Sequence, residues 1–588
     1  MAHVTPHSRV RLLIPALLCF AYLAQCAWFI ATQSLTFDET YHVVAGLDAW
    51  RQARFERWND HPPLARLLFT LPVLGSQWQI DQPDPGPARA VFPSPEALAW
   101  RVRSVNALLG LLLAVLLWFT ARGLWSEAAA NFALALFVFT PALMAHFSVA
   151  TTDGAAVLAT FAAAVQFARW RSRPTRGHTV LLGLALCAMM LSKFHAPLLF
   201  ALAVGFVLVC KPQGFTPRPR EWNWRAALAI VGITALLIWA AYFFHVTKVT
   251  LADGRVRLDS PQQTQPLIEK IPTLIHATFY VPAYEYLVGL GTVVHHNLRG
   301  HNSYFLGQLS PTGGWKLYFP VSILLKWPTV VLLLFVAAVI LALRKRIVLP
   351  SELRWMLWFP AVFFVQAIFS RINIGDRHIL PIYPFVLLVI AGLWHSLESQ
   401  RGFVGRGFSR DTKLASFDVS SGASAPEASG TAFGLSSSSF FRRLQIVLLV
   451  AVLLNAADAL RCAPDYLSWF NILVKRENAW HLLADSSLDW GQGLLALRRY
   501  EAEHPNEAIY LAYYGNVDPR LYGIRATPLK EGERVTGTVV VSSVYLAGRL
   551  LHDPDAYKWL LRHPRKALLN HTLHVFEVPP KPRPQTSR

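Results

Sequence analysis

Long apolar runs, separated by short polar segments, dominate the first four-fifths of the sequence. A run of roughly 20 apolar residues is long enough to cross the hydrocarbon core of a bilayer, which is about 30 Å thick. The pattern therefore predicts a polytopic α-helical membrane protein with about 11 transmembrane helices. These spans are expected near 11–33, 102–124, 128–149, 154–170, 178–192, 196–210, 226–246, 318–343, 355–370, 378–397 and 444–461.

The composition supports a membrane protein and excludes two other classes. Charged residues make up 15% of the 588 residues and hydrophobic residues 54%, whereas a soluble domain carries about 25% charge. An ordinary water-soluble enzyme is excluded, and so is a disordered chain. The net charge is +20 (55 Lys+Arg against 35 Asp+Glu). No basic block is interleaved with aromatic residues, so we expect no nucleic-acid partner.

The basic residues gather in alternate loops, which predicts an orientation. Lys and Arg are enriched in cytoplasmic loops, and with eleven spans all the clusters fall on the side of the N-terminus. We therefore expect a cytoplasmic N-terminus and an extracytoplasmic C-terminus. The clusters lie at 9–11, 169–176, 211–225, 344–354 and 401–443.

The chain divides into four predicted parts. Residues 1–397 form a transmembrane catalytic module with outer loops at 34–101 and 247–315. The Ser/Gly/Ala-rich stretch 398–443 is typical of a flexible cytoplasmic linker, and 444–461 is the last span. Residues 462–588 regain ordinary polarity and are expected to form a small soluble extracytoplasmic α/β domain. Its predicted elements are β-like runs at 508–514 and 538–545 and a helix at 493–503.

Ionisable residues at the ends of the spans gather on the predicted outer side. Such residues are costly near hydrocarbon and are functional candidates by default. A carboxylate can accept the proton of an attacking hydroxyl, and cations can hold a phosphate leaving group. The acidic candidates are Asp38, Glu39, Asp60 and Asp153, and the basic ones are His61, Lys193, Lys326, Arg377 and His378.

Structural roles stay open for several of these residues. Asp38 with Glu39 could cap a span, and Asp153 could cap the following helix. Lys193 could extend to the interface, and Arg377 could pair with Asp376. Whether Lys326 lies in a span or along the interface is also open. The histidines at 295, 296 and 301 fit no standard zinc spacing, so no cofactor is assigned and a divalent metal remains an open question.

Several motifs resemble those of the dolichyl-phosphate-mannose protein mannosyltransferase family. They are Phe37-Asp38-Glu39, Asp60-His61-Pro62-Pro63 and Thr152-Asp153. Later stretches are similar to the bacterial lipid-carrier branch of that family, and they are 303–307, 326–328, 377–384 and 485–492. The resemblance, together with the compact loops, suggests a bacterial inner-membrane protein.

The resemblance implies a GT-C glycosyltransferase fold. It also implies transfer of a sugar from a polyprenyl-phosphate donor to an extracytoplasmic acceptor (protein, lipid or glycan), generally with inversion. Asp38 matches the catalytic carboxylate and Glu39 completes the pair. Lys193 and Arg377 match cations that contact the carrier phosphate.

The remaining candidates follow from the same resemblance. Asp60 and His61 match a second acidic element, in which His61 would bind phosphate or a metal. Lys326 and His378 are further phosphate candidates, and His301 and Tyr304 are acceptor or loop candidates. The expected partners are the donor, membrane lipids and the acceptor.

A proton- or ion-coupled secondary transporter is the alternative function. Transporters also place ionisable residues among many spans, but their sites lie near the midplane and often within internal repeats. In this sequence the acids lie at span ends and no repeat is visible. The pattern therefore favours the glycosyltransferase.

Overall fold

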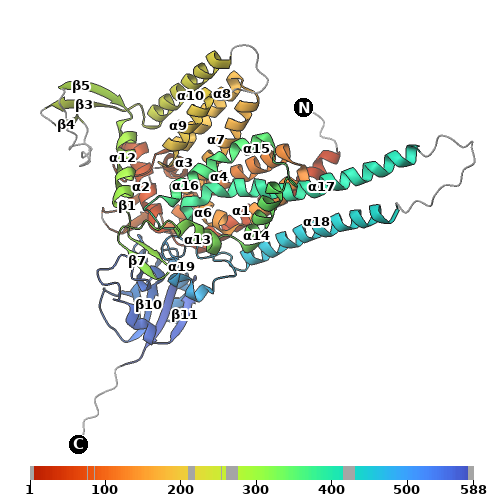
Figure 1. The fold of residues 1–588 in the computed structure, drawn as a ribbon. Coiled ribbons are helices and arrows are strands. Elements are labelled where there is room, and N and C mark those ends of the chain that lie inside the picture. Colours follow the sequence, from red (N-terminus) through yellow and green to blue (C-terminus); the bar gives the residue numbers. More distant parts are fainter. Residues whose placement is uncertain are drawn as a thin grey trace, which may run out of the picture.

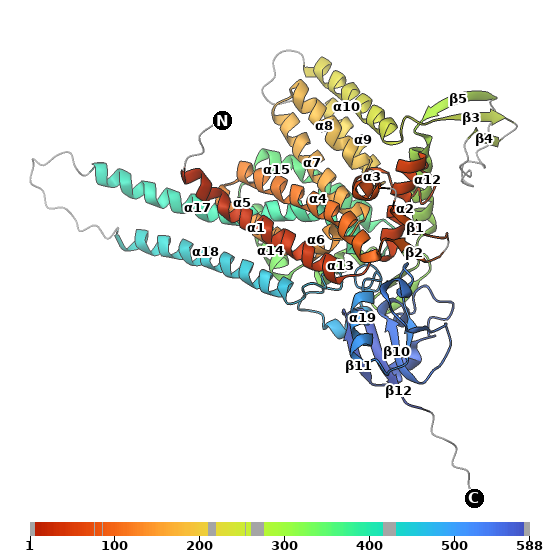
Figure 2. The same ribbon diagram turned by 180° about the vertical axis from the view of Figure 1, so that it is seen from behind.

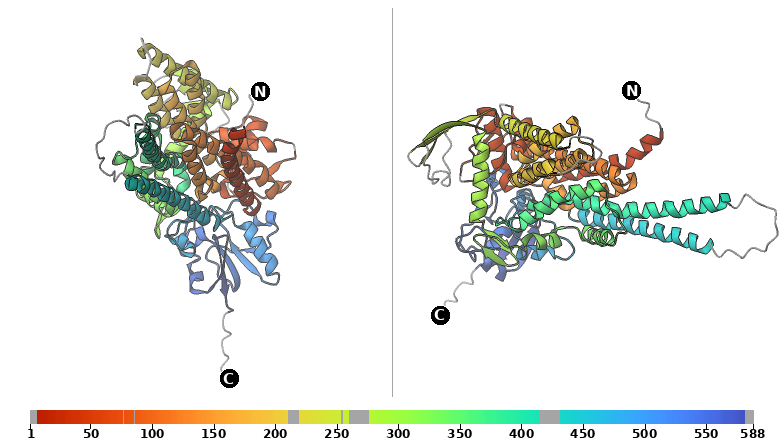
Figure 3. Two further views of the ribbon diagram at one scale, coloured as in Figure 1. Left: turned by 90° about the vertical axis from the view of Figure 1, so that its right-hand side faces the viewer. Right: turned by 45° about the horizontal axis from the view of Figure 1, so that its top comes forward.

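A helical module and a smaller domain built around a β-sheet make up the molecule (Figure 1). The computed structural model describes residues 6–75, 77–84, 86–209, 219–252, 255–259, 276–414 and 431–580. Helices α17 and α18 lie side by side and extend beyond the other helices, on the side where the N-terminus lies (Figures 1 and 3). The sheet domain lies at the opposite end of the helical module (Figure 2).

Five helical segments of the described chain are long and apolar enough to cross a membrane, which identifies an integral membrane protein. Two bent helix pairs raise this number to seven if each pair is one span, so the predicted count of eleven is not confirmed. The five segments belong to α1 (Pro6–Thr32), α4 (Pro95–Leu124), α10 (Pro219–Ala241), η2 with α17 (Asp376–Ile382 and Tyr383–Leu414) and α18 (Thr431–Leu460).

Prolines mark both breaks in the bent pairs. The pair α5 (Glu127–Val138) and α6 (Pro141–Phe147) bends by 68°, and the pair α13 (Tyr318–Lys326) and α14 (Thr329–Leu343) bends by 114°. Pro141 and Pro328 lie at these breaks, and proline lacks the N–H that would continue the helix. The second break leaves Lys326 at the end of a short helix.

The remaining helices of the module are shorter, and α17 runs through its centre. The span 376–399 is 83% buried, whereas the span of α18 is 17% buried. The central helix therefore carries a nearly continuous apolar run on all faces, as expected for a core helix. The shorter helices are α3 (Leu64–Thr70) with η1 (Leu71–Val73), α7 (Thr152–Ser172), α8 (Arg176–Met190), α9 (Ala196–Val209), α15 (Ser351–Met356) and α16 (Trp358–Ile368).

The stretch predicted as a flexible linker, 398–443, is helical at both ends. Helix α17 continues to Leu414 and α18 begins at Thr431, and 415–430 lie outside the described residues. The polar composition of the stretch does not prevent helix formation, since serine and alanine are tolerated on the surface of a helix.

The two loops predicted to lie outside, 34–101 and 247–315, contain short elements of their own. In the first, α2 (Phe37–Gln52) begins at a capping box formed by Thr36 and Glu39, which is the typical sequence signal for a helix start. The hairpin of β1 (Gln79–Asp81) and β2 (Ala90–Phe92) follows in the same loop.

The second outer loop contains two antiparallel sheets and a helix. Strands β3 (Val246–Ala252), β4 (Arg255–Asp259) and β5 (Ala277–Pro282) form one sheet, and β6 (Ser303–Phe305) pairs with β7 (Gln308–Ser310). The helix α12 (Tyr284–Arg299) lies between them in the sequence.

The C-terminal domain contains a five-stranded sheet in the order β11-β12-β10-β8-β9. Strands β8 (Ile509–Ala512) and β10 (Gly537–Ser542) coincide with the two predicted β-like runs and pair in parallel, and α19 (Leu494–Glu503) coincides with the predicted helix. The other strands are β9 (Thr527–Pro528), β11 (Arg565–Leu569) and β12 (Leu573–Val578).

The core of this domain is continuous with the first outer loop. Buried Val540 and Val575 of the sheet belong to the same apolar cluster as Leu35, Val43 and Phe69 of the N-terminal region. The two parts therefore share one apolar core.

Candidate active site

Four predicted site residues from distant parts of the chain meet in one ion-pair network. Arg377 Nη1 lies 2.8 Å from Asp38 Oδ2 and 3.9 Å from Asp153 Oδ2, and Lys193 Nζ lies 2.5 Å from Asp153 Oδ1. Asp38 stands in the first turn of α2, Asp153 in the first turn of α7, Lys193 just after α8 and Arg377 in η2. The convergence predicted from the sequence is therefore present in the structure.

The network has one accessible carboxylate. The side chain of Asp38 is 26% exposed, whereas those of Arg377 and Asp153 are 10% and 2% exposed. Asp153 also accepts a hydrogen bond from the Thr151 hydroxyl at 3.2 Å. Asp38 is therefore the carboxylate of this network that an incoming group can reach most readily.

A cavity adjoins the network, and its empty space, counted together with the part open to solvent, is about 290 Å³. Its lining includes Asp153, Lys193, His195, Arg377 and His378, together with Ala156, Phe363 and Pro381. Within the described chain, His378 Nε2 and Arg377 Nε are buried without a hydrogen-bond partner. Unpaired buried donors are costly, so both nitrogens are suited to bind a ligand in this cavity.

Glu39, next to Asp38 in the sequence, is placed differently. It is fully buried, and Arg103 holds its carboxylate through two hydrogen bonds, Nε to Oε1 at 2.9 Å and Nη2 to Oε2 at 2.8 Å. Ala150 N and the N–H and hydroxyl of Thr36 donate three more. Burial alone would raise the pKa of Glu39, but the charge of Arg103 and these donors lower it below its ordinary value.

Asp60 and His61 lie in a second group of polar side chains. Arg66 Nη2 lies 3.6 Å and His61 Nδ1 3.3 Å from Asp60 Oδ1, and the His61 ring packs edge-on against His42. The Asp60 side chain is 43% exposed, so burial opposes its ionisation only in part, and His61 and Arg66 hold its pKa below the ordinary value. The carboxylate is therefore ionised at neutral pH.

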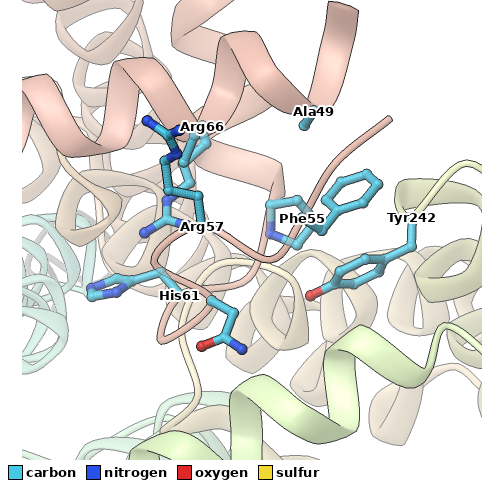
Figure 4. A pocket seen from close by; sticks show the side chains of 9 residues that line it. Ala49, Phe55, Arg57, His61, Arg66 and Tyr242 are labelled. Atoms are coloured by element: carbon cyan, nitrogen blue, oxygen red, sulfur yellow. The ribbon is translucent and has the colours of Figure 1, made fainter. Parts of the chain in front are cut away.

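This second group borders a cavity of about 310 Å³. Figure 4 shows Arg57 and Arg66 on one side of it and Phe55 with Tyr242 on the other. Its lining also includes Asn59, His61 and Pro63. Phe55 packs against Tyr242, Phe243 and His245, and aromatic clusters of this kind are common at the interface between membrane and water.

Lys326 lies outside both cavities. Its ammonium is buried and donates to three backbone carbonyls, those of Leu467 at 3.0 Å, Trp469 at 2.5 Å and Ser487 at 2.5 Å. All three N–H donors of a protonated lysine are thereby used, so no donor is left for a phosphate in this arrangement.

The candidates His301 and Tyr304 also lie apart from the ion-pair network. His301 Nδ1 is 3.0 Å from His296 Nε2, and burial lowers the pKa of His301 to about 4. Tyr304 is buried in β6. In the described part of the chain, no group of three or more His, Cys, Asp or Glu side chains is arranged to hold a metal ion.

The sequence interpretation missed two arginines and a tryptophan. Arg103 follows the start of an apolar run, and Arg66 follows the double proline, so both were isolated cations beside motifs. Trp490 belongs to the stretch 485–492, which was noted only for its resemblance, and the Arg377 guanidinium lies over its ring at 4.3 Å from the centroid. No local signal distinguishes such a tryptophan from a core residue.

Comparison with known proteins relates this site to a family. Residues 9–251, which carry Asp38, Asp60, Asp153 and Lys193, match the profile of the family described as Dolichyl-phosphate-mannose-protein mannosyltransferase. The predicted resemblance is confirmed. A search of curated protein sequences found no match.

Three solved structures are similar at low identity. ArnT from Cupriavidus metallidurans in the apo state is 15% identical, with coverage of 97% of this chain and 98% of that chain and a TM-score of 0.45. The S. cerevisiae protein O-mannosyltransferase Pmt1-Pmt2 complex bound to the sugar donor is 12% identical (78% and 90%, TM-score 0.47). AglB, the oligosaccharyltransferase from Archaeoglobus fulgidus, is 10% identical (90% and 69%, TM-score 0.45).

The family match covers less than half of the chain, and it supports the predicted resemblance over the region that carries four of the site residues. The helical module and the sheet-containing domain at the C-terminus agree with the predicted fold class.

Proposed function

We propose that this protein transfers a sugar from a polyprenyl-phosphate donor to a hydroxyl acceptor at the outer face of the membrane. The observation that carries the proposal is the network in which Arg377 joins the accessible Asp38 to the buried Asp153–Lys193 pair beside a cavity. A base and phosphate-binding cations are thereby held within one site.

The donor phosphate is assigned to the cavity of about 290 Å³. Lys193 and Arg377 supply positive charge there, and His378 supplies an unpartnered ring nitrogen. Charge-assisted hydrogen bonds from Lys and Arg to phosphate are stronger than hydrogen bonds between neutral groups. Asp153 holds Lys193 in place and reduces the charge of the empty site.

In the proposed step the acceptor hydroxyl attacks the anomeric carbon while Asp38 takes its proton. The new bond joins the acceptor oxygen to that carbon. The bond between the carbon and the phosphate oxygen breaks, and the polyprenyl phosphate leaves with the electron pair. One base suffices for such a single displacement, which inverts the configuration, whereas glycosidases use two carboxylates.

The acceptor is assigned to the second cavity. It is bordered by His61 and Arg66, and its aromatic wall of Phe55 and Tyr242 (Figure 4) suits an amphipathic or sugar-bearing molecule at the membrane interface. Asp60 positions His61 and Arg66 in this assignment. His301 and Tyr304 are assigned to the surrounding outer loop rather than to acceptor binding.

Glu39 and Lys326 receive structural roles. The Glu39 carboxylate is bound by Arg103 inside the protein. The Lys326 ammonium donates to three backbone carbonyls. The proposed location is the bacterial inner membrane, with the N-terminus in the cytoplasm and the C-terminal domain outside. The divided organisation of 1–397, 398–443, 444–461 and 462–588 is part of the same proposal.

The test offers purified protein in lipid a panel of polyprenyl-phosphate sugars and compares wild type with Asp38→Asn. We expect turnover with one donor and its loss in the variant, with the thermal unfolding temperature unchanged. Equal turnover in both would remove Asp38 from the role of base. Proton-coupled solute uptake into vesicles, without sugar transfer, would contradict the proposal as a whole.

A further inference from the structure

The C-terminal domain reaches the candidate active site through one segment, 485–492. Three backbone carbonyls of this segment accept hydrogen bonds from residues that directly precede Asp38. Phe37 N donates to Trp490 O at 2.8 Å, Ser34 N to Gln492 O at 3.1 Å and the Ser34 hydroxyl to Gly491 O at 3.0 Å. The same segment also binds the loop before Arg377.

The contacts to the Arg377 loop are equally direct. The Ser487 hydroxyl accepts from Asp376 N at 3.0 Å, and the Ser486 hydroxyl donates to the Ile374 carbonyl at 2.5 Å. Gly375 approaches so closely that a Cβ there would lie 2.6 Å from Ser486 Oγ. One segment of the outer domain thus fixes both partners of the Asp38–Arg377 ion pair.

Trp490 is the residue of this segment whose side chain contacts Arg377. Trp490 is 1% exposed. The Arg377 guanidinium lies over its ring, with Arg377 Cζ 4.3 Å from the ring centroid. Within the described residues, Arg377 uses Nη1 for Asp38, and its buried Nε has no hydrogen-bond partner. An aromatic face attracts a cation without accepting the N–H bonds that lie in the guanidinium plane.

We propose that Trp490 is a positioning residue for donor binding: it holds the Arg377 guanidinium toward the cavity and leaves the in-plane donors that Asp38 does not use, Nε among them, available to the carrier phosphate. A carboxylate in the same place would orient Arg377 equally well but would occupy those donors. The proposal rests on the assignment of Arg377 to the donor phosphate and extends the active site into the C-terminal domain.

The experiment measures the affinity of the full-length protein in lipid for a polyprenyl monophosphate, and the KM and kcat for the sugar donor. We expect Trp490→Leu to raise Kd and donor KM by roughly 3- to 30-fold, which is the range of a cation–π contact, with a smaller change in kcat. Trp490→Phe, which keeps an aromatic face, should restore most of the affinity.

The matched control is Trp559→Leu. Trp559 also lies under an arginine of the same domain, with Arg534 Cζ 5.9 Å from its ring centroid, but it takes no part in either cavity. Wild-type affinity in Trp490→Leu, or an equal loss in Trp559→Leu, would overturn the proposal.

A double-mutant cycle separates positioning from general destabilisation. If Trp490 acts through Arg377, Trp490→Leu has no further effect on phosphate affinity in an Arg377→Ala background. Additive losses would overturn the proposal. Loss of affinity in Arg377→Ala with none in Trp490→Leu would overturn only the role of Trp490. Unchanged affinity in Arg377→Ala would instead overturn the donor site of the proposed function.

Discussion

Glu39 and Arg103 form a fully buried pair joined by two hydrogen bonds, and Glu39 directly follows the accessible Asp38 in the sequence. Adjacent acids in one motif therefore differ in environment. Glu39 fixes the start of α2 to α4 and to the backbone at Ala150, whereas Asp38 contacts Arg377 at the cavity.

Substitutions at these two positions should give opposite results. Glu39→Gln leaves Arg103 buried without its counter-charge, which typically costs about 3–5 kcal/mol, so we expect a large fall in thermal stability. Asp38→Asn should retain the wild-type unfolding temperature and lose sugar transfer. Unfolding followed in detergent, together with turnover, checks both. A stable but inactive Glu39→Gln would instead indicate a catalytic role for Glu39.

Lys193 and Arg377 should affect donor binding more than acceptor binding. Lys193→Gln removes one positive charge from the cavity and leaves Asp153 with a weaker partner, so we expect donor KM to rise by roughly 10-fold or more. Arg377→Lys keeps the charge but not the planar donors and should cause a similar loss. Steady-state kinetics with each substrate varied in turn is the measurement, and a change confined to the acceptor KM would argue against this assignment.

Lys326→Met should weaken the junction between the helical module and the C-terminal domain. Three buried carbonyls would lose their donor, and each unsatisfied group costs about 1–3 kcal/mol. We therefore expect destabilisation, seen as faster proteolysis of the folded protein, with an unaltered donor KM in the fraction that stays folded. Lys316→Met, at an exposed position, is the control. A raised donor KM at full stability would return Lys326 to the phosphate site.

Arg57→Glu tests the second cavity. Arg57 lines this cavity, while its Nε lies 3.3 Å from Asp48 Oδ2. Reversing the charge should weaken binding of the acceptor. We expect a higher acceptor KM and an unchanged donor Kd. Arg89→Glu, an exposed change in the same outer loop, should leave both constants as they are. A selective effect on the donor would show that the two cavities are assigned the wrong way round.

The C-terminal domain should lose stability in mild acid. His574 is buried in β12 and contacts the Ser543 hydroxyl, and burial, followed by the nearby Arg565, lowers its pKa from 6.5 to about 3. His574 takes up a proton less readily in the folded state than in the unfolded state. The stability that it contributes is therefore fully present above pH 6.5 and is lost progressively as the pH falls toward 3. The loss at pH 5 is about 2 kcal/mol.

A non-titrating residue at this position should remove the effect. In His574→Gln, the change in unfolding free energy between pH 7.5 and pH 5 should shrink by about 2 kcal/mol relative to wild type. His552→Gln, at a fully exposed side chain, is the control and should keep the wild-type dependence. Equal pH profiles in wild type and His574→Gln would contradict the prediction.

The sequence predicted the membrane module, the two β-runs of the C-terminal domain and a set of ionisable residues at the ends of spans, four of which meet in one network. It could do so because a charge at the end of an apolar run must find a partner or water. The same rule did not distinguish Arg377, whose partner faces a cavity, from Lys326, whose partners are backbone carbonyls. That distinction depends on the 114° bend between α13 and α14, which sets where the lysine points.

The number of spans was harder to predict for a related reason. Short apolar helices such as α8 and α9 have the hydropathy of a span but not its length. The roles of Glu39 and Trp490 depend on contacts with residues 64 and 113 positions away in the sequence, Arg103 and Arg377. Such contacts leave no periodic pattern along the chain.

The hydrogen bonds from Ser34 and Phe37 to 490–492 have a consequence for biosynthesis. The ribosome releases the Asp38 segment more than 450 residues before the segment that completes its support. During translation the early helices are therefore made before segment 490–492, whose carbonyls bind Ser34 and Phe37, has been synthesised. The backbone support of the segment before Asp38 is therefore complete only when the last fifth of the polypeptide has been made.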